Sequence, residues 1–126
     1  MSADESSAVV CRVTEAINRK DLATLSTHPG LAEFTAHMRA FVWPAFPDVR
    51  GTVVDEVAAG EWVAQRLTLR GTHQGPLLSI APTSKTITWE VISMCRVANG
   101  TVVDSHAQAD LLGMLRQLGG LHTMGG

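Results

Sequence analysis

Acidic, imidazole and amide side chains alternate along one segment near the C-terminal end of the sequence. Positions of equal parity carry Val102, Asp104, His106 and Gln108, with Asp110 at the end. In a β-strand, residues of equal parity share one face. Carboxylate and imidazole groups gathered in this way can transfer protons without a cofactor. The odd-numbered residues of the same segment have small and mostly apolar side chains. Alternation alone does not decide which of the two faces lines a pocket.

Asp110 has two interpretations. As a general acid/base, its carboxylate would remove a proton from an activated carbon, and conjugated carbonyls of the substrate would delocalise the resulting charge. An apolar pocket would raise the basicity of that carboxylate. Asp is also a preferred residue at the start of a helix, so Asp110 is equally expected as the N-cap of a last helix, and one carboxylate could do both.

His106 is expected as a donor or general acid toward a substrate oxygen, or else as a histidine whose ring is satisfied by backbone. About 13 Å of regular strand would separate it from Asp110, which rules out a hydrogen-bonded dyad. The two would instead flank opposite ends of a multi-ring substrate, with Gln108 between them as a polar guide.

Other polar and aromatic residues have competing interpretations. His73 lies among glycines, which favours a structural role over substrate contact. Glu90 is expected to form a surface ion pair with Arg66 or Arg70 rather than to act as a pocket acid. Trp89 and Met94 either line an aromatic-binding cavity or belong to the core, and His37 and His122 are expected in solvent and in the tail.

Composition excludes several classes of protein. The 126 residues fit one domain, 45% of them are hydrophobic, and 17% are charged. Ten Lys and Arg against twelve Asp and Glu give a net charge of −2, without the dense basic face that nucleic acid requires. No membrane span or basic, apolar signal peptide is evident, so a cytoplasmic protein is expected.

Metal and cofactor signatures are also absent from the sequence. There is no CxxC, HExxH or glycine-rich phosphate loop, so no metal and no cofactor is expected. The two cysteines, Cys11 and Cys95, lie in apolar segments and are expected to be buried free thiols.

The elements that must position these residues can be read from periodicity. Ser2 and Glu5 form a capping box before an amphipathic helix over residues 3–19, and a short helix over 22–26 follows. Apolar residues at helical spacing from Leu31 to Phe41 predict a third helix that Pro44 stops.

From residue 48 the apolar period changes to two. Strands are expected over 49–58, 62–73, 85–97 and 101–109, and Asn99-Gly100 predicts a hairpin turn. Asp110 opens a last helix that Gly119 stops. These elements predict an α+β domain over residues 1–119, a curved antiparallel sheet with helices on one face, followed by a flexible glycine-rich tail over 120–126.

Five short motifs occur in a defined order: Phe46-Pro47-Asp48-Val49-Arg50, Gly71-Thr72-His73-Gln74-Gly75-Pro76, Pro82-Thr83-Ser84-Lys85, Asp110-Leu111-Leu112-Gly113 and Gln117-Leu118-Gly119. Over about three-fifths of the chain they resemble the SnoaL-like polyketide cyclase family of the nuclear-transport-factor-2-like (NTF2-like) superfamily. The resemblance implies a cone-shaped barrel of N-terminal helices packed on a strongly curved, mostly antiparallel sheet around an apolar pocket, and commonly a homodimer. Two departures alter the pocket mouth: a shortened stretch over residues 26–30, and His106 where many relatives carry Trp.

The resemblance implies a cofactor-independent cyclase or isomerase that acts on a small hydrophobic polycyclic, polyketide-derived intermediate by aldol-type chemistry, as in antibiotic biosynthesis. It matches Asp110 to the family's general acid/base. The catalytic candidates are Asp110 and His106, and the substrate-binding candidates are His28, His73, Trp89 and Gln108. Two alternatives remain: an epoxide-opening or hydroxylation-associated member that uses Asp104, Asp110 and Arg66, and a non-catalytic binding or dimerisation module. An enzyme predicts Asp110 inside the pocket, whereas a binding module predicts it turned outward as a cap.

Overall fold

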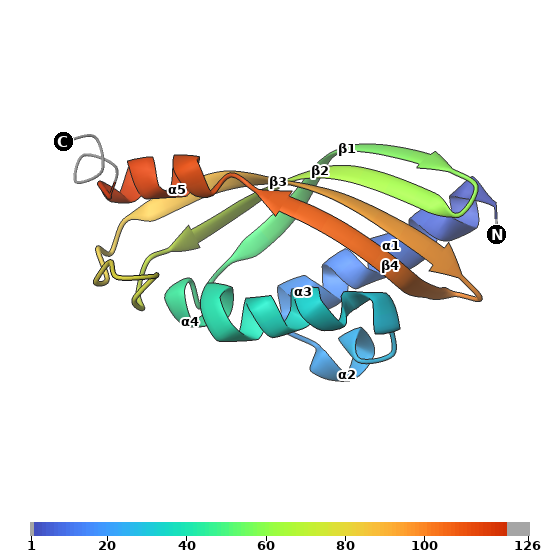
Figure 1. The fold of residues 1–126 in the computed structure, drawn as a ribbon, viewed down its shortest axis with the longest axis horizontal. Helices are drawn as coiled ribbons and strands as arrows, with labels where there is room; N and C mark the ends of the chain where they lie inside the picture. Colours follow the sequence, from blue (N-terminus) through green and yellow to red (C-terminus); the bar gives the residue numbers. More distant parts are fainter. Residues whose placement is uncertain (1, 121–126) are drawn as a thin grey trace.

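Helical segments come first and antiparallel strands follow in the computed structural model, which describes residues 2–120 (Figure 1). The first helical segments are α1 (Ala3–Arg19), α2 (Leu22–Leu25), η1 (Pro29–Leu31), α3 (Ala32–His37), η2 (Met38–Val42) and α4 (Trp43–Ala45). The strands are β1 (Arg50–Ala59), β2 (Trp62–Thr72), β3 (Thr86–Ala98) and β4 (Thr101–Ala109), and α5 (Leu111–Leu118) follows them. The α+β prediction is confirmed. His122 and the predicted tail, apart from Gly120, lie outside the described residues.

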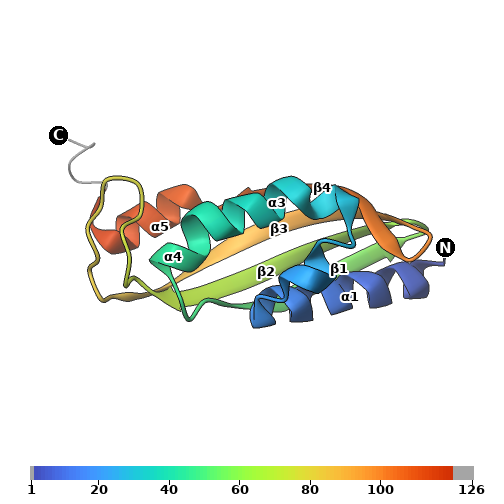
Figure 2. The ribbon, with the colours of Figure 1, turned by 90° about the horizontal axis from the view of Figure 1, so that it is seen from below.

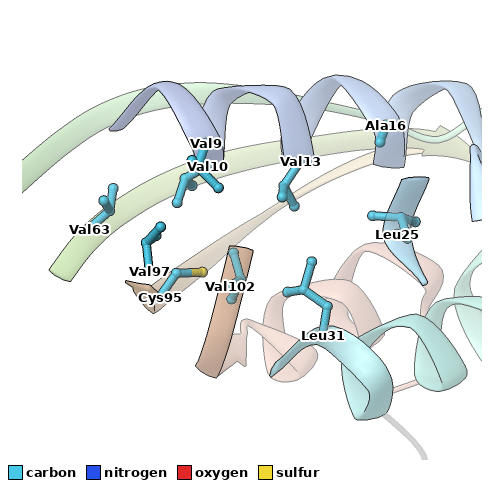
Figure 3. Close-up of a cluster of buried hydrophobic side chains, with 10 residues drawn as sticks. All are labelled: Val9, Val10, Val13, Ala16, Leu25, Leu31, Val63, Cys95, Val97 and Val102. Carbon is cyan, nitrogen blue, oxygen red and sulfur yellow. The ribbon is translucent and has the colours of Figure 1, made fainter. Parts of the chain in front are cut away.

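The long first helix covers the concave face of the sheet. Its capping box forms as expected: the Glu5 N–H donates to Ser2 Oγ at 3.1 Å, and the Ser2 N–H donates to Glu5 Oε1 at 3.2 Å. Valines on one side of α1 pack against Val63, Val97 and Val102 of the sheet (Figure 3). This amphipathic packing holds α1 under the strands.

The third helix follows a less regular path than its periodicity predicted. A 3₁₀ turn begins it and a π-helical segment, Met38–Val42, interrupts it. The prediction that Pro44 stops the helix was wrong by one residue, because α4 runs from Trp43 to Ala45. Pro44 lies in α4 directly after the π-helical segment, so the helix continues one residue past it. This helical stretch lies over the same side of the sheet as α1 (Figure 2).

The four strands form one antiparallel sheet in the order β1-β2-β3-β4, and the sheet bends over the helices (Figure 1). The strand bounds agree with the sequence expectation to within a residue. The hairpin turns have positive φ at Gly60 (56°), Asn99 (51°) and Gly100 (77°), and the second of these turns is the predicted Asn99-Gly100 hairpin.

A bulge in β4 breaks the alternation on which the equal-parity set depended. Asp104 pairs with Arg96, but Val102 pairs with Val97, so Val103 is the extra residue. Val102 therefore turns into the core with 0% exposure. Asp104 lies opposite the half-exposed Arg96 on the outer face of the sheet. His106 and Gln108 lie on the same face further along the strand. The shared face predicted for Val102 and Asp104 was wrong because strict alternation does not survive a bulge.

The two cysteines are free thiols in different environments. Cys95 is buried, and burial raises the pKa of its thiol to about 11. Cys11 is exposed on the outer side of α1, so its predicted burial was wrong. No helix within residues 2–120 is long and apolar enough to cross a membrane.

Candidate active site

Two neighbouring hollows lie between the helices and the concave face of the sheet. The inner cavity, about 70 Å³, lies beneath α1 and is lined almost wholly by apolar side chains. A larger groove of about 890 Å³ runs between the α3–η2 helix and β4, and reaches α5. Both are lined by Phe34, Met38, Leu69, Val91, Ser105, His106 and Ala107. The groove and the inner cavity therefore lie side by side and share these residues as a common wall.

Small side chains of β4 form one wall of this groove. Ser105 pairs with Cys95, whose side chain is in the core, so Ser105, Ala107 and Ala109 face inward past the bulge. All three line the groove. Alternation left open which face lines the pocket, and the structure answers that the small, mostly apolar set does. Small residues here leave room for a flat ligand between the strand and α3.

An imidazole and a carboxylate meet at the rim of the groove. His106 Nε2 lies 3.3 Å from Asp104 Oδ2, and both residues border the groove because β4 is an edge strand. Their side chains are 70% and 44% exposed. His37, which stacks on Phe41 with ring centroids 5.4 Å apart, and Glu33 border the groove from α3. The sequence did not indicate Glu33 as a site residue, and it placed His37 in solvent. Neither residue belongs to a motif that would link its helix to β4.

Asp110 lies at the end of β4 as the N-cap of α5. Its Oδ1 accepts a hydrogen bond from the Gly113 N–H at 2.9 Å, so the capping interpretation is confirmed. The side chain is exposed and is not among the groups that line the groove, although its neighbours Ala109 and Leu111 are. Within residues 2–120, Oδ2 accepts no hydrogen bond. Asp110 is therefore turned outward as a helix cap, which is the placement predicted for a binding module rather than for a base inside the pocket.

Two of the predicted substrate-binding histidines are buried in hydrogen bonds of the fold. His28 Nδ1 accepts the Val102 N–H at 2.9 Å, which ties the start of η1 to β4. His73 is 0% exposed, and its Nδ1 contacts Thr83 Oγ1 at 3.0 Å and accepts the Thr83 N–H at 3.2 Å. Burial lowers the pKa of both imidazoles. Neither lines the groove or the inner cavity.

The remaining predicted residues divide between the groove and the outer face. Trp89 is buried at the groove and packs against Phe46, with ring centroids 4.8 Å apart. Gln108 is exposed beside Ile92 on the outer face and lines neither hollow. Glu90 forms the expected surface ion pair, 3.1 Å from Arg66, which also binds Asp55 at 2.7 Å.

The glycine- and proline-rich motifs build the end of the sheet rather than a binding surface. Asp48 accepts hydrogen bonds from the Thr72 N–H (2.7 Å) and hydroxyl (2.8 Å), and these bonds lower its carboxyl pKa. A Cβ on Gly71 would lie 2.8 Å from the Cβ of Phe46, so glycine is required for the close packing of this ring. These contacts brace the groove floor.

The last two motifs dock α5 on the sheet. Gln117 accepts the Thr88 N–H at 3.0 Å and donates to the Thr88 carbonyl at 2.7 Å. β4 ends before it reaches Thr88, so this side-chain amide takes the place of the missing strand. Together with the Asp110 cap, it fixes α5 at the end of the groove.

Comparison with known proteins decides the family. The sequence profile described as SnoaL-like polyketide cyclase matches residues 3–118, nearly the whole chain. The chain belongs to the SnoaL-like polyketide cyclase family. Among its relatives, the aklanonic acid methyl ester cyclase DauD of Streptomyces sp. (strain C5) is 29% identical over 88% of this chain and 80% of its own length. The corresponding cyclase DnrD of Streptomyces peucetius is 30% identical over 75% of this chain and 68% of its own.

Solved structures agree with this assignment. AclR of Streptomyces galilaeus, a candidate hydroxylase, superposes with a TM-score of 0.84 at 27% identity and covers 94% of this chain and 83% of its own. IdmH of Streptomyces antibioticus, a candidate polyketide cyclase, gives a TM-score of 0.79 at 30% identity over 90% and 98% of the two chains. The SnoaL-like fold is therefore established, and the named relatives support an enzyme of the SnoaL cyclase type.

Proposed function

We propose that this protein closes a ring in a polyketide-derived polycyclic intermediate, without a cofactor, inside the groove between α3 and β4. The observation that carries the proposal is the apolar groove of about 890 Å³ that adjoins the inner cavity in a SnoaL-like chain. Sites of roughly 300–1,000 Å³ suit ligands of several fused rings. Trp89 and Met38 supply an apolar floor, and the small wall of β4 admits a flat molecule.

In the proposed reaction Asp110 is the general acid/base. Its available oxygen, Oδ2, takes a proton from a carbon flanked by carbonyl groups, and the resulting enolate carbon attacks a ketone carbon of the same molecule. The new carbon–carbon bond leaves an alkoxide, which recovers the proton from Asp110. Substrate and product are therefore isomers. Asp110 follows the groove-lining residue Ala109 at the end of the groove, but its side chain is exposed outside the lining, so the role requires a substrate that extends past this end of the groove.

His106 is the proposed hydrogen-bond donor to the ketone oxygen, where it stabilises the alkoxide until Asp110 returns the proton. It borders both hollows, and its second ring nitrogen, Nδ1, has no hydrogen-bond partner in residues 2–120. A donor at the opposite end of the groove from Asp110 suits a multi-ring substrate. His28 and His73 are left out of the proposed reaction because their Nδ1 atoms are engaged in buried hydrogen bonds.

The names of two relatives supply the test substrate, aklanonic acid methyl ester. The purified protein is incubated with this ester, and the products are separated and weighed by mass spectrometry. The proposal predicts a new product of unchanged mass and, from substrate that carries deuterium at the attacking carbon, a product that has lost one deuterium to the solvent. A pocket that binds the ester without turning it over would contradict the proposal and support the non-catalytic module.

A hydroxylation role is the second candidate, because AclR superposes on this chain over 94% of its length. It predicts a product that has gained one oxygen atom, which the same mass measurement distinguishes from an isomer. An epoxide-opening site built on Arg66 is less well supported, since this guanidinium is held by Asp55 and Glu90 on the outer face.

We also propose a homodimer formed through the outer face of the sheet. Val57, Ile92 and Met94 are exposed there, at 70%, 56% and 46%. An apolar patch on a sheet face that helices leave bare is typical of an interface. The proposal predicts a dimeric mass by light scattering and a shift toward monomer in Ile92→Asp.

A further inference from the structure

Part of the free edge of β4 faces the groove. The strand order makes β4 an edge strand, and η1 contacts its first half, from Val102 to Ser105. There the Ser105 hydroxyl donates to the Gly30 carbonyl at 2.7 Å, and a Cβ on Gly30 would lie 2.4 Å from the Asp104 nitrogen. Beyond Ser105 no other segment within residues 2–120 pairs with this edge.

The direction of the backbone groups on this edge follows from two sets of hydrogen bonds. The Asp110 N–H donates to the Glu90 carbonyl at 2.9 Å, and Gln117 binds both backbone groups of Thr88. Even-numbered residues at this end of β3 therefore turn their N–H and C=O groups toward β4. Their partners in register are even-numbered residues of β4, including Gln108 opposite Ile92.

Backbone groups alternate in direction along an antiparallel strand. Since Gln108 bonds to β3, the N–H and C=O groups of Ala107 and Ala109 point away from the sheet. Both residues line the groove, and their methyl side chains leave these backbone groups accessible. The two N–H groups are spaced by about 6.8 Å, twice the rise per residue of a strand.

We propose that the backbone N–H groups of Ala107 and Ala109 bind oxygen atoms of the polycyclic substrate and stabilise negative charge that develops there. The proposal rests on the proposed function, because it takes the groove ligand to be a planar polyketide whose carbonyl oxygens are hydrogen-bond acceptors. When a proton leaves carbon, charge moves onto such an oxygen, and fixed backbone donors stabilise it without reorganisation. These two backbone donors would act together with the side chains of Asp110 and His106 in the proposed reaction.

The first test uses amide resonances of the wild-type protein and emodin, a planar trihydroxyanthraquinone, as the probe. Emodin is expected to shift the N–H resonances of Ala107 and Ala109 downfield, while the N–H of Gln108, bonded within the sheet, moves little. Shifts of groove side chains such as Met38 without shifts of these two amides would overturn the proposal and leave the groove assignment intact. If emodin shifts no resonance of any groove residue, both the proposed backbone donors and the proposed ligand site in the groove are contradicted.

The second test removes one donor. Ala107→Pro deletes an N–H that makes no sheet hydrogen bond, and proline is tolerated at such edge positions. Ala107→Ser retains the N–H and is the matched control. We expect emodin to bind about fivefold more weakly to Ala107→Pro than to Ala107→Ser, the effect of one hydrogen bond. Equal affinities would overturn the proposal, and if Ala107→Pro does not fold, the amide shifts decide.

Discussion

Asp110 and Gly113 fit each other at the start of α5. The Gly113 N–H donates to Asp110 Oδ1 at 2.9 Å, and a Cβ on residue 113 would lie 2.2 Å from Asp110 Oδ2. Glycine is a poor helix former, so its presence inside an eight-residue helix needs a reason. The reason is the carboxylate, which occupies the space that any side chain at residue 113 would need.

Gly113→Ala should therefore destabilise the protein, although the same change in an ordinary exposed helix stabilises it by about 1 kcal/mol. Displacement of the Asp110 cap is expected to cost about 1–2 kcal/mol, which offsets or exceeds that gain, so urea titration should show a net fall of up to about 1 kcal/mol in the free energy of unfolding. In an Asp110→Ala background the clash is absent, so there Gly113→Ala should be stabilising. A gain in stability in the wild-type background would contradict this account of the motif.

Gln117→Ala should expose both backbone groups of Thr88. The expected loss is about 1–2 kcal/mol of unfolding free energy, together with faster hydrogen exchange at the Thr88 amide. Gln108→Ala is the matched control, since Gln108 is exposed on the outer face. Slow hydrogen exchange at the Thr88 N–H in Gln117→Ala would show that the Gln117 side chain does not take the place of a strand.

Stability should decline as the pH falls from about 7 to about 5. Burial lowers the pKa of His28 and His73 below the ordinary value of 6.5, so the unfolded chain takes up protons in this range before the folded protein does. Asp21 and Asp48 have lowered pKa values and lose their contribution at more acidic pH. Urea midpoints at several pH values check this, and His28→Asn should flatten the slope. A slope that is the same in His28→Asn would be inconsistent with the burial of this imidazole.

A large side chain at residue 107 should fill the groove. Ala107 borders both hollows, so Ala107→Phe is expected to weaken binding of a polycyclic ligand at least about tenfold, the equivalent of roughly 1.4 kcal/mol. Gln108→Phe places the same ring on the outer face and should leave binding unchanged. Calorimetric titration with emodin measures both, and equal affinities would place the ligand elsewhere.

Much of the fold could be predicted because local signals and global packing agree. The Ser2 capping box, the Asn99-Gly100 turn and the Gly119 stop each act on their nearest neighbours, so the sequence carries them directly. The Arg66–Glu90 pair also followed from adjacent strands. The π-helical turn before Pro44 could not be predicted, because no residue type specifies it.

The candidate site was harder to predict for a physical reason. The bulge at Val103 changes which residues of β4 share a face, and it depends on how η1 packs at Gly30, far away in the sequence. Side-chain chemistry drew attention to Asp104, His106 and Gln108, whereas the wall of the groove is made by the small residues between them. Asp104 and His106 lie at the rim of the groove, and Gln108 lies on the outer face of the sheet.

The central claim is that the Asp110 carboxylate transfers the proton during ring closure. Its most direct test is the turnover of aklanonic acid methyl ester by Asp110→Asn, because asparagine still caps a helix and cannot accept the proton. The account predicts a fall in kcat of at least about a hundredfold, with unchanged stability. Retention of wild-type kcat by Asp110→Asn, with loss of turnover in His106→Gln instead, would contradict it and assign the base to the rim of the groove.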